Sequence, residues 1–256
     1  KYGFPVDVAT LATSFGSTSG DFGKIELSRD LSLAISEYSP GSEVVAGGKI
    51  LTSAGVVKPA NINFGSLTYK ALTCDSCGWF IHKRLPDDAS VNLDFPSNCE
   101  SCGFPLNPSS AIKFLQPKFG FVAKVDTKSA GSKSKPRKVA PIKTFASSTS
   151  ILGDKWEKRG KLSYSISQDA KLLTLSTGMF WLCGTCGYST PLTGSPRAAA
   201  SHQDPRREQP CSGVLSRITY GHEYMTDVIR LQLNSSARYS CSCEEPDCQG
   251  PLESLA

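Results

Sequence analysis

The sequence predicts a mainly β fold of the α+β class, with short antiparallel strands and few helices. Glycine and proline are frequent, at 22 and 16 of the 256 residues, which favours turns and short strands over long helices. Apolar residues make up 39% of the chain and fall mostly in short runs bounded by Gly, Pro, Ser or Asn. One segment alone has apolar residues at helical spacing.

That segment predicts a short helix over Arg29–Tyr38. Ser28 can cap its first turn, and Pro40-Gly41 would end it. The residues that follow the i, i+3, i+4, i+7 pattern are Leu31, Ala34, Ile35 and Tyr38.

Strands are predicted where short apolar runs lie between turn residues. Glu43–Ala46 and Lys49–Ser53 flank Gly47-Gly48, a favourable hairpin turn. An apolar, aromatic stretch over Phe114–Val125 is interrupted by Pro117. The other predicted strands are Leu67–Leu72, Ile142–Phe145, Leu162–Ile166, Leu172–Leu182, Arg217–Tyr220 and Asp227–Leu233.

Composition divides the chain into five segments. Residues 126–141 are rich in Lys, Ser, Gly and Pro, which predicts a basic flexible loop. Before it lie a strand and helix region (1–73) and a cysteine module with its following strands (74–125). After it lie strands with a second cysteine module (142–234) and a cysteine-containing tail (235–256). Because the chain opens on Lys1, we expect a piece of a longer polypeptide.

Two Cys-x-x-Cys-Gly turns, separated by 21 residues, predict the first of two zinc-ribbon-like knuckle modules. They are Cys74-Asp-Ser-Cys77-Gly and Cys99-Glu-Ser-Cys102-Gly. Each turn supplies two thiolates, and the glycine provides the left-handed backbone conformation that the turn needs. Four thiolates leave no position open for water, so this zinc site is expected to be structural rather than catalytic.

A third turn, Cys183-Gly-Thr-Cys186-Gly, predicts half of a second zinc site. Its other half must come from His202, Cys211 or the later cysteines. We favour His202 and Cys211, because both lie in or beside the adjoining polar loop over 195–210. His222 is an alternative ligand, although its place beside a strand favours a core role. Two interpretations of the later cysteines remain open: a partial third metal site, or thiols of the tail without a metal. These cysteines are Cys241, Cys243 and Cys248.

Positive charge is concentrated in one part of the chain. The net charge is +5, yet 13 Lys and Arg face only three Asp and Glu between Ala111 and Lys161. Such a segment can neutralise DNA phosphates, and the alternative is a solvated linker. The candidate DNA contacts are Lys128, Lys133, Lys135, Arg137, Lys138 and Lys143.

Other function classes are excluded by missing motifs. The sequence has no signal peptide and no apolar run of membrane-spanning length. The cysteine pattern favours metal over disulfides, so we expect a reducing cytoplasm. Phosphate-binding, zinc-protease, zinc-deaminase and nucleophile-elbow motifs are absent. With three histidines in all, this segment is predicted not to be an enzyme.

Several phrases occur in a fixed order around the cysteines. They are Tyr2-Gly-Phe-Pro-Val-Asp7, Arg29-Asp-Leu-Ser-Leu-Ala-Ile-Ser-Glu-Tyr38, Ser39-Pro-Gly-Ser-Glu-Val-Val45, Thr52-Ser-Ala-Gly55, Pro117–Phe121 and Gly221-His-Glu-Tyr-Met-Thr-Asp-Val228. Together they resemble the C-terminal zinc-binding region of large bacterial DEAD/DEAH-box helicases and their companions. That group includes the Mrf-type repair helicase and proteins of the Druantia and DISARM anti-phage systems.

The resemblance implies an accessory domain of a DNA helicase in anti-phage defence or DNA repair. In that family the region follows two motor domains, so DNA, the motor domains and a companion subunit are the implied partners. The motor motifs are absent here, so ATPase activity would belong to the parent protein. Two alternatives stay open: a protein-docking platform without nucleic-acid contact, and a self-standing enzyme with an unrecognised site.

Overall fold

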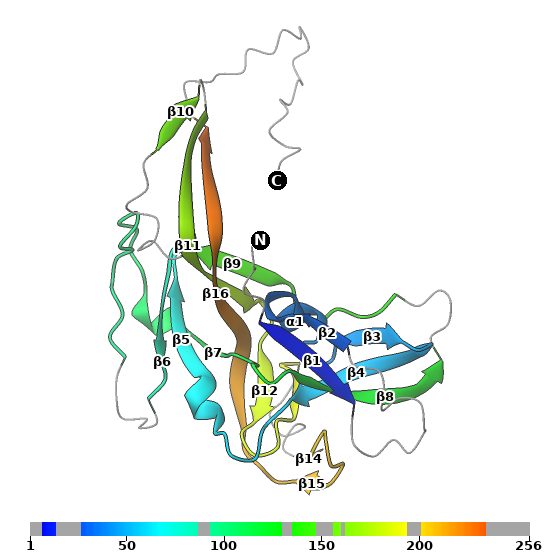
Figure 1. The fold of residues 1–256 in the computed structure, drawn as a ribbon. Coiled ribbons are helices and arrows are strands. Elements are labelled where there is room, and N and C mark those ends of the chain that lie inside the picture. Colours follow the sequence, from blue (N-terminus) through cyan, green and yellow to red (C-terminus); the bar gives the residue numbers. More distant parts are fainter. Residues whose placement is uncertain are drawn as a thin grey trace, which may run out of the picture.

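The mainly β prediction is confirmed. The computed structural model describes residues 7–13, 27–86, 93–129, 135–146, 156–159, 162–193 and 201–233. Within these ranges it holds one α-helix and three β-sheets (Figure 1). The division into five segments made from composition stays a prediction.

A five-stranded sheet is built from the first part of the chain and one later strand. Its order is β2-β1-β8-β4-β3, and β1 with β8 is its parallel pair. The strands are β1 (Val8–Thr13), β2 (Leu27–Asp30), β3 (Glu43–Ala46), β4 (Lys49–Val56) and β8 (Phe121–Ser129). The predicted hairpin around Gly47-Gly48 is confirmed as β3 and β4, which pair antiparallel.

A nine-stranded sheet holds most of the remaining strands. Its main path is β10-β11-β16-β7-β5-β6, while β9 pairs with β11, β12 with β16, and β13 with β12. These strands are β5 (Thr68–Thr73), β6 (Phe80–Arg84), β7 (Ile112–Leu115), β9 (Ile142–Ala146), β10 (Glu157–Arg159), β11 (Leu162–Ser176), β12 (Phe180–Cys183), β13 (Ser189–Pro191) and β16 (Leu215–Leu233). The third sheet is the small pair β14 (His202–Gln203) and β15 (Pro210–Cys211).

Two strands are longer than the sequence predicts. Leu162–Ile166 and the start of Leu172–Leu182 are one strand, β11, and both predicted C-terminal strands are one strand, β16. The two pair from Leu162 opposite Leu233 to Leu175 opposite Gly221, with one irregularity between Ser167 and Ala170. Polar residues do not end a strand here, because the neighbouring strand supplies the backbone hydrogen bonds. In Figure 1 their far halves project as a long ribbon with β10 beside it.

The predicted helix begins later than expected. Ser28 and Arg29 pair with β1 as part of β2, so the helix α1 covers Leu31–Glu37. Asp30, not Ser28, caps it, because the Asp30 carboxylate accepts a hydrogen bond from the Ser32 backbone N–H at 2.8 Å. The predicted apolar face is correct, since Leu31, Ala34, Ile35 and Tyr38 are all buried. Two short 3₁₀ turns, η2 (Phe64–Leu67) and η3 (Pro108–Ser110), precede β5 and β7.

The largest core cluster joins α1 to strands of both large sheets. Its fully buried side chains include Ile35 of α1, Phe121 of β8, Phe180 of β12 and Tyr220 of β16. A second cluster of six residues surrounds Phe114 and Leu173 in the nine-stranded sheet. A third, small cluster contains Trp79 with two cysteines. These two cysteines, Cys74 and Cys99, therefore pack in a cluster separate from the largest one.

Two stretches of the basic segment 126–141 belong to the described residues. β8 continues to Ser129, and residues 130–134 lie outside the described residues. Further on, the Arg137 backbone exchanges hydrogen bonds with Glu43 of β3, and Ala140 is only 1% exposed. Sheet pairing therefore holds the start of this segment, and core packing holds its end.

Candidate metal centres

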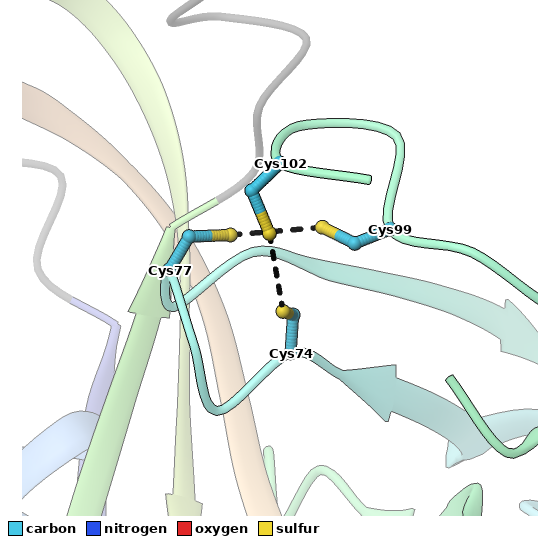
Figure 2. A group of neighbouring side chains, drawn as sticks. All are labelled: Cys74, Cys77, Cys99 and Cys102. Atoms are coloured by element: carbon cyan, nitrogen blue, oxygen red, sulfur yellow. Dashed lines mark hydrogen bonds between the residues drawn. The ribbon is translucent and has the colours of Figure 1, made fainter. Parts of the chain in front are cut away.

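The first centre gathers four cysteines from two turns. Cys74 follows β5 directly and Cys77 lies just before β6, while Cys99 and Cys102 belong to the loop that leads toward β7. Their side chains point toward one another in Figure 2. The Cys74 and Cys102 Sγ atoms are 3.7 Å apart, those of Cys77 and Cys99 are 3.6 Å apart, and all four lie within 4.8 Å of one another.

The backbone of each turn is built in the same way. In the first, the Gly78 N–H donates to the Cys74 carbonyl at 2.8 Å, and the Cys74 N–H donates to the Trp79 carbonyl at 2.7 Å. The turns that start at Cys99 and Cys183 repeat this pair of bonds. The glycines that close the three turns, Gly78, Gly103 and Gly187, have φ of 76°, 73° and 83°. The left-handed conformation predicted from the motif is therefore present in all three turns.

The second centre joins the third turn to the small sheet. Cys183 ends β12, and Cys186 follows three residues later. His202 of β14 lies directly opposite Cys211 of β15, and this pairing brings both side chains to the turn. The Cys183 and Cys211 Sγ atoms are 3.8 Å apart, and the four donor atoms lie within 4.8 Å of one another. The structure thus groups the eight predicted ligands into two sets of four.

His202 has the surroundings expected of a ligand. Its side chain is 8% exposed and stacks on Tyr188, with ring centroids 4.7 Å apart. Neither ring nitrogen has a hydrogen-bond partner among the described residues. A buried polar atom without a partner costs about 1–3 kcal/mol, and a metal ion on one nitrogen would remove part of that cost. The residues present therefore fit a metal ion.

The alternative ligands lie elsewhere. His222 is on β16, 2% exposed, and its Nε2 is 3.8 Å from the Asp7 carboxylate. It belongs to neither group of donor atoms. Cys241, Cys243 and Cys248 lie outside the described residues, so both interpretations of those cysteines stay open.

Backbone N–H groups favour the thiolate form in both centres. The Phe104 N–H lowers the pKa of the Cys102 thiol to about 7, whereas burial raises the pKa of Cys99 to about 12. At Cys183 burial opposes ionisation, but the N–H groups of Cys186 and Thr185 bring its pKa to about 7. Burial raises the pKa of Cys186. A divalent cation would replace the remaining protons, because thiolates are its ligands.

The donor sets are typical of structural zinc. One offers four sulfurs and the other three sulfurs with one imidazole, and both are complete at four ligands. Such a set holds chain segments together and leaves no position for a substrate. A zinc ion held by either set would therefore stabilise the fold.

The basic residues predicted to contact DNA lie in two places. Lys135, Arg137 and Lys138 are exposed, and the Lys138 ammonium is 3.9 Å from Glu37 of α1. Lys143 lies beside the first centre, where its ammonium is 2.6 Å from the Asp75 carboxylate. Lys128 is on β8, and its side chain is not described. Lys133 lies entirely outside the described residues.

A histidine–glutamate pair inside the nine-stranded sheet was not predicted from the sequence. The His82 Nε2 of β6 is 2.8 Å from the Glu223 carboxylate of β16, and the Lys171 ammonium is 4.0 Å from the same group. The hydrogen bond from His82 holds the pKa of Glu223 below its usual range. No local signal announces this pair, because more than a hundred residues separate its members in sequence.

Sequence comparison gives one informative relative. No family model matches the chain, and no solved structure matches it. Over 230 residues the chain is 24% identical to "Druantia protein DruE" of Escherichia coli (strain UMEA 4076-1). This chain is similar to a Druantia protein. The similarity covers 80% of the chain but only 12% of DruE, so most of DruE has no counterpart here. None of the helices in the described residues is both long and apolar enough to span a membrane.

Proposed function

We propose that this chain is a zinc-stabilised accessory domain of a large DNA helicase or translocase that acts in anti-phage defence or DNA repair. The observation that carries the proposal is the pair of four-ligand centres within a chain similar to DruE. Two zinc ions would be held, one by Cys74, Cys77, Cys99 and Cys102 and one by Cys183, Cys186, His202 and Cys211.

Its contribution would be mechanical and electrostatic rather than catalytic. Complete four-ligand sites fix the frame, and ATP hydrolysis would belong to motor domains of the parent protein. The frame braces those motor domains and presents cations to DNA. The setting would be the cytoplasm, where thiols stay reduced and available to zinc.

DNA engagement is supported by how the basic segment is held. The Arg137 carbonyl accepts the Glu43 N–H, and the Arg137 N–H donates to the Glu43 carboxylate. These bonds and the burial of Ala140 attach this segment to the core. Lys135 and Arg137 therefore extend into solvent from a fixed base. Cations held in this way lose less entropy on contacting phosphates than cations on a free tail.

A salt titration tests this contribution. Fluorescence anisotropy would measure binding of the zinc-loaded chain to labelled single- and double-stranded oligonucleotides. The double variant Lys135→Glu and Arg137→Glu should weaken binding at least tenfold and flatten the dependence of affinity on salt. The matched control is the double variant Lys158→Glu and Arg159→Glu on β10. It changes the net charge by the same amount at another exposed basic pair.

The alternative function is a protein-docking platform without nucleic-acid contact. The exposed apolar residues Ile166, Ile229 and Leu231 on the β11–β16 ribbon favour it, with exposed fractions of 55%, 64% and 63%. Absence of DNA binding at low salt, together with affinity for the remainder of the parent protein or a companion subunit, would replace the first proposal by this one.

A further inference from the structure

A cleft of about 660 Å³ lies beside the second metal centre. Among the described residues that line it, three are cations, Lys58, Arg206 and Arg207, and Asp204 is the one acidic side chain. The rest of its lining is Pro59, Ala60, Thr185 and Cys186. No local pattern groups these cations, because Lys58 is more than a hundred residues away from the arginines.

Two walls of the cleft are attached to the second centre. Thr185 and Cys186 belong to the third cysteine turn, and the two arginines lie in the hairpin between His202 and Cys211. Each end of that hairpin therefore carries a candidate ligand of the second centre, His202 at one end and Cys211 at the other. Lys58 follows β4, and its ammonium donates to the Thr185 carbonyl at 3.2 Å. The third turn, the hairpin and the segment after β4 thus bring the three cations to one cleft.

The negative groups of the cleft already have backbone partners. The Asp204 carboxylate accepts the N–H groups of Arg206 and Arg207 at 2.8 and 3.2 Å, which shapes the turn that carries them. The Cys186 sulfur accepts the Tyr188 N–H at 3.4 Å. These N–H groups offset part of the negative charge of the lining, and among its described residues cations outnumber carboxylates, which favours an anion.

The chemistry of the lining selects a phosphate. A guanidinium matches phosphate oxygens with two parallel hydrogen bonds, and the Thr185 hydroxyl adds a further donor. No aromatic side chain is among the described residues that line the cleft, so these residues offer no platform on which a base could stack. Such a site suits the sugar–phosphate backbone better than a free nucleotide.

We propose that this cleft binds a phosphodiester of the nucleic-acid backbone, without regard to sequence, through Lys58, Arg206 and Arg207. The proposal rests on the DNA engagement proposed above and adds a contact that depends on the second metal centre. The cleft and the basic segment over 135–143 are then two separate contacts with one nucleic acid.

Paired variants test the cleft. Arg206→Gln with Arg207→Gln should weaken oligonucleotide binding about tenfold in low salt, and should lower the salt slope by about 1.5 if two phosphate contacts are lost. Lys58→Gln, which lies outside the hairpin, should weaken oligonucleotide binding by a smaller factor. The matched control, Lys158→Gln with Arg159→Gln, removes two charges from another exposed pair and should bind like the parent chain. Zinc content and melting temperature, measured on every variant, show whether the hairpin is intact.

The outcomes separate the two proposals. If the parent chain binds no oligonucleotide, both fail. Suppose instead that the parent chain binds, and that binding is weakened in the variant of Lys135 and Arg137 but in neither cleft variant. The cleft proposal alone is then wrong.

A competition experiment distinguishes the source of the phosphate. If inorganic pyrophosphate displaces an oligonucleotide at equal phosphate concentration, the cleft is assigned to a small ligand and the proposal is overturned. Displacement only at a large excess of pyrophosphate supports it.

Discussion

At the residue scale, Glu223 shows how the sheet accommodates charge. Its side chain is 21% exposed, and His82 and Lys171 lie against its carboxylate. Since the folded pKa of Glu223 lies below its unfolded value, chiefly through the hydrogen bond from His82, the ionised carboxylate favours the folded state. That stability is present above the unfolded pKa of about 4.5 and is lost as pH falls through the folded pKa.

Glu223→Gln should therefore lower the free energy of unfolding by about 1–2 kcal/mol at pH 7, because it removes the charged partner of His82. The deficit relative to the parent chain should shrink as the pH falls below about 4.5. Urea unfolding of both proteins at pH 7, 5 and 3.5 measures this. Comparing the two at each pH cancels the loss of zinc that acid causes in both. If the difference in free energy of unfolding between the two proteins stays constant over this pH range, ionised Glu223 is not the source of the stability.

At the element scale, the three cysteine turns share one backbone but differ in their surroundings. A Cβ on Gly78 or Gly103 would meet no atom within 4 Å. On Gly187 it would lie 2.3 Å from the Val56 carbonyl oxygen at the end of β4. The Val56 N–H also donates to the Gly187 carbonyl at 2.9 Å. The third turn is therefore docked on the five-stranded sheet, whereas the glycines of the first two face open space.

Alanine substitution separates these two situations. Gly103→Ala should cost about 1–2 kcal/mol of stability, the penalty of a left-handed residue with a Cβ. Gly187→Ala should cost clearly more, because the same penalty is joined by a clash with backbone that cannot move freely. Thermal and urea unfolding of both variants, with zinc content as the control, gives the comparison. Equal destabilisation would show that the contact with Val56 is unimportant.

At the scale of the whole molecule, the two centres stabilise different parts. The first centre has a small core of Cys74, Trp79 and Cys99, with Ile81 and Leu106 packed against it. The second lies at the end of β12, whose Phe180 and Leu182 belong to the largest core cluster. Loss of the first centre should therefore loosen one module, whereas loss of the second should weaken the main core.

Ligand variants with hydrogen exchange test this difference. Cys102→Ala and His202→Ala should each lower the zinc content from two ions per chain to one. In Cys102→Ala, protection should be lost around Trp79 and kept in β4 and β8. In His202→Ala, protection against exchange should fall in β12 and in the strands around β12. His222→Asn, which alters a buried histidine outside both centres, should keep both ions; two ions in His202→Ala would remove that residue from the ligands.

Much of the local structure is predictable from neighbouring residues. The apolar face of α1, the hairpin at Gly47-Gly48 and the three glycine-closed turns depend on interactions within a few positions. The limits of elements are less predictable. Ser28 looks like a helix cap in sequence, yet pairing with β1 draws it into β2. The polar residues within β16 resemble a break, yet pairing with β11 keeps them extended.

The sequence by itself determined the class of fold, the three cysteine turns and the residue types available to hold metal, because these follow from spacing along the chain. Only the tertiary structure decided that His202 and Cys211 lie beside the third turn, that His82 meets Glu223, and that Lys58 lines one cleft with Arg206 and Arg207. These groups come from strands and loops far apart in sequence. Their proximity results from sheet pairing and core packing, which no local pattern encodes.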